Sequence, residues 1–167
     1  NALLEKGDKV FIVDNFNDYY NPKLKYDRIK QLKRSKNRKN LKVYKLDISN
    51  YKKLEKIFKK NNFDKICHLA AQAGVRYSLK NPFIYEKSNS LGTLNLLELT
   101  KKFKIQDFIF ASSSSVYGGN KKIPFSEKDK VDNPVSLYAA TKKSNELYAY
   151  AYHHLYGLNC TGLRFFT

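Results

Sequence analysis

Short runs of apolar residues alternate along the chain with longer segments in which apolar positions recur every three or four residues. A short apolar run with β-branched and aromatic members is typical of a buried strand, and the longer spacing is typical of a helix with one buried face. The pattern predicts strands at residues 8–13, 41–46, 64–69, 107–111 and 158–165. It predicts helices at 23–36, at 82–103 with a break near Ser88, at 135–155, and after a cap at Ser49 or Asn50, with a loop at 118–133.

Strands that alternate with helices predict parallel β-α-β units. Because such crossovers are right-handed, the units wind into an α/β fold, a doubly wound parallel sheet with helices on both faces. Ligands of this architecture bind at the carboxyl ends of the strands, so we look there for chemistry. The 167 residues fit one domain, and a hydrophobic content of 42% excludes natural disorder.

Positive charge is concentrated in one stretch of the chain. Residues 21–60 hold 16 Lys and Arg against three Asp and Glu, in a chain whose net charge is +17. Charge alone is compatible with a nucleic-acid surface or with solvated helices. Lys outnumbers Arg 27 to 5, and Arg is the better ligand for bases and phosphates, which favours solvated helices and no nucleic-acid partner.

Two further features bound the class of protein. No apolar run approaches the roughly 18 residues that a membrane span needs, so no membrane association is predicted. Cys67 and Cys160 are too few for a disulfide framework, which favours a reducing, cytoplasmic location. No metal site is predicted.

Acidic and small residues follow the predicted strands. Asp14 ends the first strand, where an acid can accept hydrogen bonds from an adenosine ribose, although a turn-forming Asp14–Asn15 pair explains the same residues. No Arg follows to hold a 2′-phosphate, which favours NAD over NADP. The third strand contains His68, which we interpret as a structural residue. Small residues follow this strand, and they are compatible either with a ligand close to the backbone or with tight packing of helix on sheet.

Four serines, 112–115, follow the fourth strand, and their hydroxyls can bind a sugar or form a polar turn. Tyr138 and Lys142 lie four residues apart on the last helix and therefore share a face. A free phenol is a poor base at neutral pH, and a nearby ammonium favours the phenolate. Tyr138 can thus act as acid or base in an alcohol–ketone interconversion, with Lys142 tuning it. The pair alone is common by chance, and the serines upstream strengthen it.

Nearly the whole chain resembles the extended short-chain dehydrogenase/reductase family, and it is most similar to its nucleotide-sugar epimerases, in particular the UDP-glucuronate 4-epimerases. The resemblance is carried by segments such as HLAAQAGVRYS, ASSSSVYG and PVSLYAATKKSNELYAY. It implies that residues 1–167 are a partial, Rossmann-like NAD-binding domain. The family's first strand, its glycine-rich phosphate loop and its C-terminal substrate-binding part have no counterpart in this sequence. We therefore expect a fragment that is inactive alone.

The resemblance also implies roles for individual residues. Tyr138 is the catalytic acid/base, Lys142 its partner and ribose ligand, and Ser113 the hydrogen-bond partner of the reacting sugar hydroxyl. Ser114, Ser115 and Thr167 are implied to bind the carboxylate of the sugar. Arg76 either helps to bind a charged substrate or has a structural role in its loop. Contacts with NAD are implied for Asp14, Asn15, Asp47, Ile48, Leu69, Ala70, Ala71, Gln72 and Asn89.

The implied reaction is transient oxidation at C4 of a UDP-sugar by NAD, rotation of the 4-keto sugar, and reduction on its other face. A homodimer through residues 94–99 and the Tyr138 helix is expected. A UDP-glucose 4-epimerase remains an alternative. A 4,6-dehydratase is disfavoured because Ser114 and Ser115 stand where that enzyme has Asp and Glu. More distant alternatives are a basic nucleic-acid-binding module and a catalytically dead relative.

Overall fold

The computed structural model describes residues 1–166 of the chain, which forms two compact units, Asn1–Ile48 and Ser49–Thr167. The first unit contains α1 (Ala2–Glu5), β1 (Val10–Asp14), α2 (Pro22–Leu32), a short 3₁₀ turn η1 (Arg38–Asn40) and β2 (Leu41–Lys45). Its two strands pair in parallel, as the sequence pattern predicts. Asn21 caps α2 by accepting a hydrogen bond from the Lys23 amide, and Pro22 occupies the first helical turn, where its missing N–H costs nothing.

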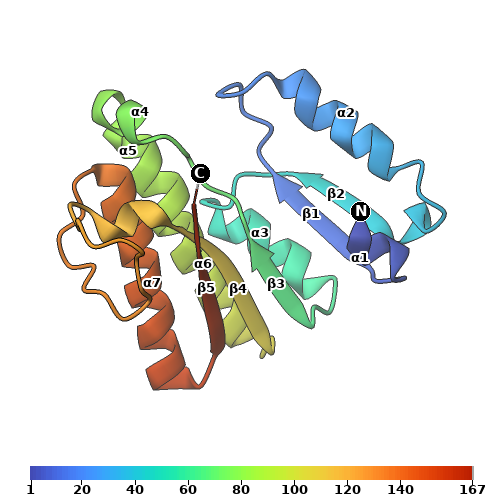
Figure 1. The fold of residues 1–167 in the computed structure, drawn as a ribbon. Helices are drawn as coiled ribbons and strands as arrows, with labels where there is room; N and C mark the ends of the chain where they lie inside the picture. The colour runs from blue at the N-terminus through green and yellow to red at the C-terminus, as the bar shows by residue number, and fades with distance from the viewer. Residues whose placement is uncertain (167) are drawn as a thin grey trace. The chain divides into compact units, whose positions relative to one another are not determined.

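The second unit holds a parallel sheet in the order β3-β4-β5. Helices α6 and α7 run side by side along this sheet, as Figure 1 shows. The unit's elements, in chain order, are α3 (Tyr51–Lys59), β3 (Lys65–His68), α4 (Val75–Lys80), α5 (Pro82–Tyr85), the π-helix η2 (Glu86–Leu91), α6 (Gly92–Lys102), β4 (Asp107–Ser113), the 3₁₀ turn η3 (Ser114–Tyr117), α7 (Leu137–Tyr156) and β5 (Asn159–Phe165). The chain is therefore α/β with parallel sheets and helices, which confirms the predicted fold class.

Apolar stripes on the helices form the core of the second unit. Leu54, Ile57 and Phe58 of α3 are buried, as their spacing predicts, and the Asn50 side chain caps this helix through the Lys53 amide. Leu97 and Leu99 of α6 and Phe108 of β4 are fully buried. Gly157, in the left-handed conformation, ends α7, which Ser136 caps at its start.

Several boundaries differ from the sequence prediction. Helix α2 ends at Leu32 rather than 36, because a polar run with Ser35 and Asn37 follows and turns the chain. Strand β4 extends to Ser113, so two of the four serines belong to the strand itself. The sequence pattern missed α4, whose six residues are too few to display a helical stripe.

The break predicted near Ser88 is a π-helix rather than an interruption. Glu86–Leu91 continues α5 into α6 with one wider turn. Single π turns in α-helices concentrate at functional sites. The turn carries Asn89, which is completely buried.

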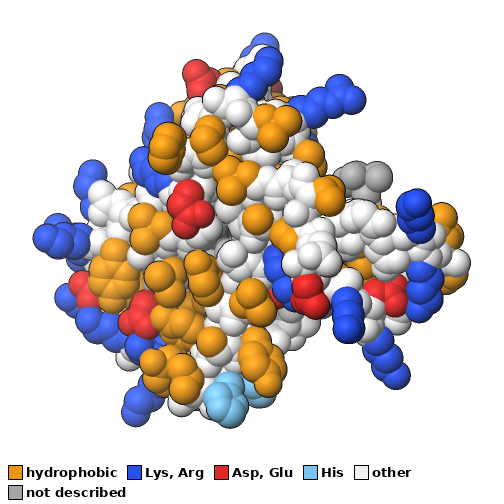
Figure 2. Space-filling view, turned by 90° about the vertical axis from the view of Figure 1, so that its left-hand side faces the viewer, with side chains coloured by type: hydrophobic (Ala, Val, Ile, Leu, Met, Phe, Trp, Pro, Cys, Tyr) orange, Lys and Arg blue, Asp and Glu red, His pale blue; other side chains and the backbone are white. Residues whose placement is uncertain are grey.

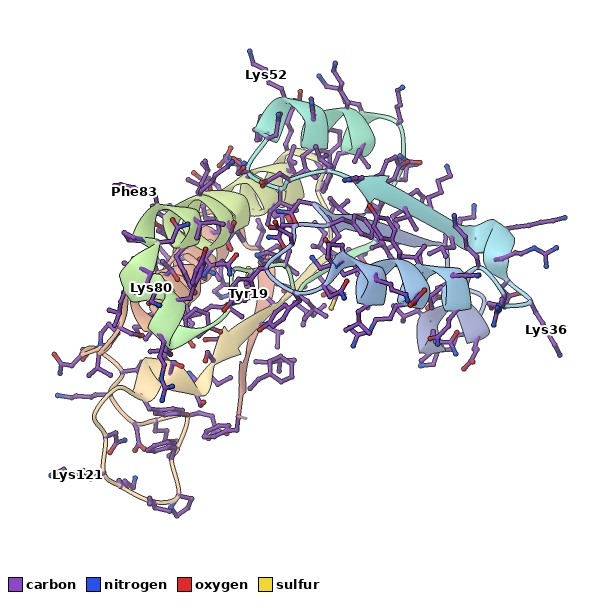
Figure 3. The ribbon with its side chains drawn as sticks, turned by 90° about the horizontal axis from the view of Figure 1, so that it is seen from above. Tyr19, Lys36, Lys52, Lys80, Phe83 and Lys121 are labelled. Carbon is purple, nitrogen blue, oxygen red and sulfur yellow. The ribbon has the colours of Figure 1, made fainter. Side chains whose placement is uncertain are left out.

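The positive charge lies on exposed surface, as both the solvated-helix and the nucleic-acid interpretation require. Helix α2 has no buried residue, and Figure 3 shows Lys36 and Lys52 each pointing away from its own segment.

No helix within residues 1–166 combines the length and the apolar character needed to cross a membrane. Cys67 and Cys160 are free thiols.

Candidate active site

The serine run turns from strand into 3₁₀ helix at the carboxyl end of β4. Ser112 and Ser113 are buried, whereas Ser114 and Ser115 are partly exposed. The Ser113 hydroxyl donates to the Ser115 hydroxyl at 3.1 Å and accepts from the Ser115 amide at 3.1 Å. These bonds cap η3 and bring the candidate catalytic Ser113 next to one candidate carboxylate ligand.

Helix α7 supplies the tyrosine and the lysine. Its first turn is fixed by Ser136, whose hydroxyl accepts from the Ala139 amide at 3.1 Å. Lys142 is only 3% exposed, and its ammonium donates to the Ala111 carbonyl of β4 at 2.9 Å rather than to Tyr138. Burial lowers the pKa of Lys142 to about 8. An ammonium has three donors, so this bond leaves further donors for a ligand.

Tyr138 is held by a second tyrosine that the sequence prediction missed. The ring of Tyr85 meets the Tyr138 ring edge-on, with 6.1 Å between the centroids. Tyr85 is fully buried, and its hydroxyl donates to the carbonyls of Ala73 and Gly74. The aromatic contact thus joins the candidate acid/base to the loop after β3. Helical spacing could not reveal this partner, because Tyr85 lies on another helix.

The loop after β3 combines exposed and deeply buried residues. Leu69 is 62% exposed and Ala71 is also exposed, whereas Ala70 is half-buried. Gln72 is only 2% exposed. The small side chains therefore leave backbone accessible where the resemblance implies a cofactor, while Gln72 turns inward.

Asn89 fastens this loop to the π-helix and to α7. Its side chain accepts from the Gln72 amide at 2.7 Å and donates to the Gln72 carbonyl at 3.1 Å and to the Thr141 hydroxyl at 3.1 Å. The Thr141 hydroxyl in turn donates to the Tyr138 carbonyl at 2.8 Å. Both ends of the Asn89 amide are thus used within the protein. Nε2 of Gln72, by contrast, is buried without a hydrogen-bond partner.

His68 is a structural residue of β3, as its position in the sequence predicts. Its Nε2 lies 2.8 Å from the Thr93 hydroxyl, and the side chain is 5% exposed. Burial, with the nearby Lys142 charge, lowers the pKa of His68 to about 3. The imidazole is therefore neutral at physiological pH.

The candidate adenosine site belongs to the first unit. Oδ1 of Asp14 accepts from the Phe16 amide at 2.6 Å and from Lys25 at 3.1 Å, and the side chain stays 39% exposed. Oδ1 of Asn15 accepts from the Asn17 amide at 3.0 Å. Asp14 and Asn15 therefore shape the turn after β1, and both contacts of Asp14 leave its other oxygen for a ligand. The sequence prediction did not foresee Lys25.

The remaining candidates belong to different elements of the chain. Asp47 is half-buried and Ile48 is buried after β2 in the first unit. Arg76 is exposed on α4 in the second. Thr167 lies outside the described residues. Within residues 1–166 no group of three or more His, Cys, Asp or Glu could hold a metal ion.

The structure thus gathers one cluster in the second unit. It consists of the β4 serines, the Tyr138–Lys142 face of α7 and the Gln72 loop, joined through Ala111, Asn89 and Tyr85. A half-buried carboxylate, Glu146, lies on the same face of α7 and was also missed by the sequence prediction. Its position, eight residues after Tyr138, is the signal that could have found it.

Comparison with known proteins identifies the family. The model of the GDP-mannose 4,6-dehydratase family matches residues 1–167. The chain belongs to this family, part of the NAD-dependent epimerase/dehydratase group of extended short-chain dehydrogenases/reductases. The resemblance found in the sequence is thereby confirmed.

Individual relatives are similar over nearly the whole chain. An uncharacterised protein of Methanocaldococcus jannaschii is 57% identical over 95% of this chain and 48% of its own length. UDP-glucuronate 4-epimerase 4 of Arabidopsis thaliana is 53% identical over 99% of this chain and 37% of its own length. The crystal structure of UDP-glucuronic acid 4-epimerase from Bacillus cereus, in complex with UDP-glucuronic acid and NAD, superposes with a TM-score of 0.87 at 34% identity. It is matched over 99% of this chain and 51% of its own. The chain thus spans about half, or less, of the length of these relatives.

Proposed function

We propose that the protein containing this sequence is an NAD-dependent nucleotide-sugar 4-epimerase, and that it interconverts UDP-glucuronate and UDP-galacturonate. The single observation that carries the proposal is the joining of α7 to the end of β4. The buried Lys142, one turn from Tyr138, bonds to Ala111, immediately before the serine run. An acid/base phenol, a buried cation and strand-end hydroxyls are the groups that an alcohol–ketone interconversion requires.

Each side chain then has a task. Tyr138 takes the proton of the sugar 4-hydroxyl as the carbon is oxidised and returns a proton when the ketone is reduced. Ser113 donates a hydrogen bond to the same oxygen, which stabilises the charge that develops there. Lys142, one helical turn from Tyr138, anchors this face of the helix to the Ala111 carbonyl. When bound, NAD supplies the oxidation and re-reduction of the sugar carbon.

The residues present fit such a cofactor. Nε2 of Gln72 is a buried donor without a partner in the protein, and a buried donor is costly unless a ligand satisfies it. It would serve a cofactor lying on the accessible backbone of Ala70 and Ala71. Lys142 would hold a ribose with its remaining donors, and Asp14 would accept from the adenosine ribose through its second oxygen. Residues 1–167 would then belong to one NAD-binding domain.

The serines support a sugar acid as substrate. Ser114 and Ser115 are partly exposed beside Ser113, and two hydroxyl donors suit a carboxylate better than a hydroxymethyl group. The same positions lack the acidic pair that a 4,6-dehydratase would use, although the family model carries a dehydratase's name. UDP-glucose is the competing substrate, because the same Tyr, Lys and Ser would serve it.

A substrate comparison tests the proposal. The whole protein that contains this sequence is assayed with UDP-glucuronate and with UDP-glucose, and the products are separated by chromatography. We expect UDP-galacturonate to form from UDP-glucuronate. Turnover of UDP-glucose alone would refute the sugar-acid assignment, and turnover of neither sugar would refute the epimerase.

We also propose that the protein forms a homodimer through α6 and α7. Figure 2 shows hydrophobic side chains gathered over these helices, above the histidines near the end of α7. Leu94 and Leu147 are 36% and 55% exposed there, and Tyr150 is 71% exposed. Such a patch is typical of an interface. Leu147→Glu is expected to turn a dimer into a monomer in analytical ultracentrifugation, and a monomeric wild type would refute the proposal.

A further inference from the structure

Glu146 of α7 binds two strands at once. Its Oε1 accepts from the Ser112 hydroxyl at 2.6 Å and from Nε of Arg164 at 2.9 Å, and its Oε2 accepts from Nη2 of Arg164 at 2.9 Å. The Glu146 and Arg164 side chains are only 17% and 18% exposed, and Ser112 is 3% exposed. This two-pronged pair is geometrically specific, unlike a surface ion pair.

The two partners of Glu146 are themselves neighbours in the sheet. Ser112 of β4 and Arg164 of β5 stand opposite each other in the parallel register. The carboxylate therefore spans the two strands one pair before their pairing ends at Ser113 and Phe165. Because successive strand residues point to opposite faces, fixing Ser112 toward α7 also fixes the direction of Ser113.

Glu146 and Lys142 together set the helix against the strand. Tyr138, Lys142 and Glu146 are spaced four apart and share one face of α7. Lys142 bonds to the Ala111 carbonyl and Glu146 to the next residue of β4, Ser112. Two anchors on consecutive strand residues leave α7 little freedom to rotate or to slide along its axis.

The surroundings keep Glu146 ionised. Burial raises the pKa of Glu146, but the hydrogen bonds from Arg164 and Ser112 outweigh burial and leave it below the usual range. The Lys143 ammonium, 3.9 Å away, acts in the same direction. The Arg164 guanidinium also lies 4.9 Å from the ring of Tyr117, at the end of η3. The charged pair therefore ties together the helix, both strands and the turn that follows the serines.

We propose that Glu146 is a positioning residue, which holds α7 against the end of β4 so that Tyr138 and Ser113 meet the same substrate oxygen. It touches neither substrate nor cofactor and acts through Ser112 and through the helix. The inference rests on the proposed epimerase function and adds to it a residue that the sequence motifs do not contain. A shift of about 1 Å between reacting groups can lower a rate by about 10²-fold.

The test uses the whole protein and compares kcat with KM. Glu146→Gln keeps the shape of the side chain and removes its charge. Glu55→Gln is the matched control, since Glu55 is 15% exposed and binds Lys59 and Lys102 far along the chain from the site. Should Glu146→Gln fail to fold, Ser112→Ala removes the other end of the contact, and Ser112→Thr restores the hydroxyl.

We expect Glu146→Gln and Ser112→Ala to lower kcat at least about tenfold while KM for the UDP-sugar stays within about twofold, the pattern of an effect confined to the transition state. Ser112→Thr should regain most of kcat, and Glu55→Gln should keep it. The inference is overturned by kcat within about twofold of wild type in the folded variants. It is overturned equally by a Ser112→Thr variant as slow as Ser112→Ala, or by an equal loss in Glu55→Gln. A wild type that turns over no UDP-sugar overturns the proposed function as well, whereas an active wild type with unchanged variants overturns the positioning role alone.

Discussion

His68 should make the folded protein sensitive to mild acid. The imidazole is buried against the Thr93 hydroxyl, and burial, assisted by the Lys142 charge, lowers the pKa of His68 to about 3. In the unfolded chain a histidine titrates near pH 6.5. Between these two pKa values His68 is protonated in the unfolded chain and neutral in the folded protein. The free energy of unfolding therefore falls as the pH is lowered through this range.

The loss of folding stability between two pH values depends only on the pKa of His68 in the unfolded chain, provided that its pKa in the folded protein lies well below both pH values. From pH 7 to pH 5, protonation of His68 in the unfolded chain should remove about 2 kcal/mol of folding stability, roughly a 30-fold change in the folding equilibrium. Above pH 7 the contribution is complete and constant. The loss should continue as the pH falls further toward 3.

Urea unfolding at pH 7 and pH 5 measures this loss. Wild type is compared with His68→Gln, whose amide can still bond to Thr93 but takes up no proton. Carboxylates such as Asp129 and Glu146 titrate equally in both proteins and cancel in the comparison. We expect wild type to lose about 2 kcal/mol more than the variant. Equal losses would refute the burial of a neutral imidazole.

Other predictions concern catalysis and packing. Tyr138→Phe should lower kcat of the whole protein at least about 10²-fold in the epimerase assay, and near-normal turnover would remove Tyr138 from its role. Lys142→Met should raise the midpoint of thermal unfolding at pH 7 while lowering kcat, because it replaces a buried charge with a similar apolar shape. Wild-type stability should also rise between pH 8 and pH 10.5, where the unfolded chain holds a proton that folded Lys142 has lost, and this rise should be absent from the variant. Gly162→Ala should cost about 1–3 kcal/mol in urea unfolding, since the new Cβ would lie 2.6 Å from Cζ of Phe110. Phe110→Leu should relieve part of that cost, so strictly additive losses would contradict the clash.

Much of the fold could be predicted because its signals are local. The strands are short apolar runs. The spacing of Leu54, Ile57 and Phe58 places all three on one face only if the segment is a helix. The cap at Asn50 and the stop at Gly157 follow from side-chain and backbone chemistry within one turn. The periodicity of a segment therefore indicates its secondary structure without knowledge of its tertiary contacts.

The site could be predicted only in part, since its arrangement depends on contacts between distant segments. The Tyr138–Lys142 spacing places both residues on one face, but no pattern indicates that the ammonium bonds to Ala111. Likewise, the use of the Asn89 amide by the Gln72 backbone depends on a π turn that no local propensity specifies. Tertiary packing decides these contacts, and the sequence shows only which residues are available for them.

The π turn at Glu86–Leu91 has a consequence for changes in chain length. A residue added to an α-helix normally rotates everything beyond it by about 100°, whereas a π turn takes up one extra residue within a single wider turn. Loss of one residue from this segment could therefore return the turn to α geometry and leave α5 and α6 facing as they do now. Asn89 would move away from the Gln72 backbone, and the loop after β3 would lose its fastening. A one-residue deletion here would thus disturb the loop after β3 before it weakened the helices on either side.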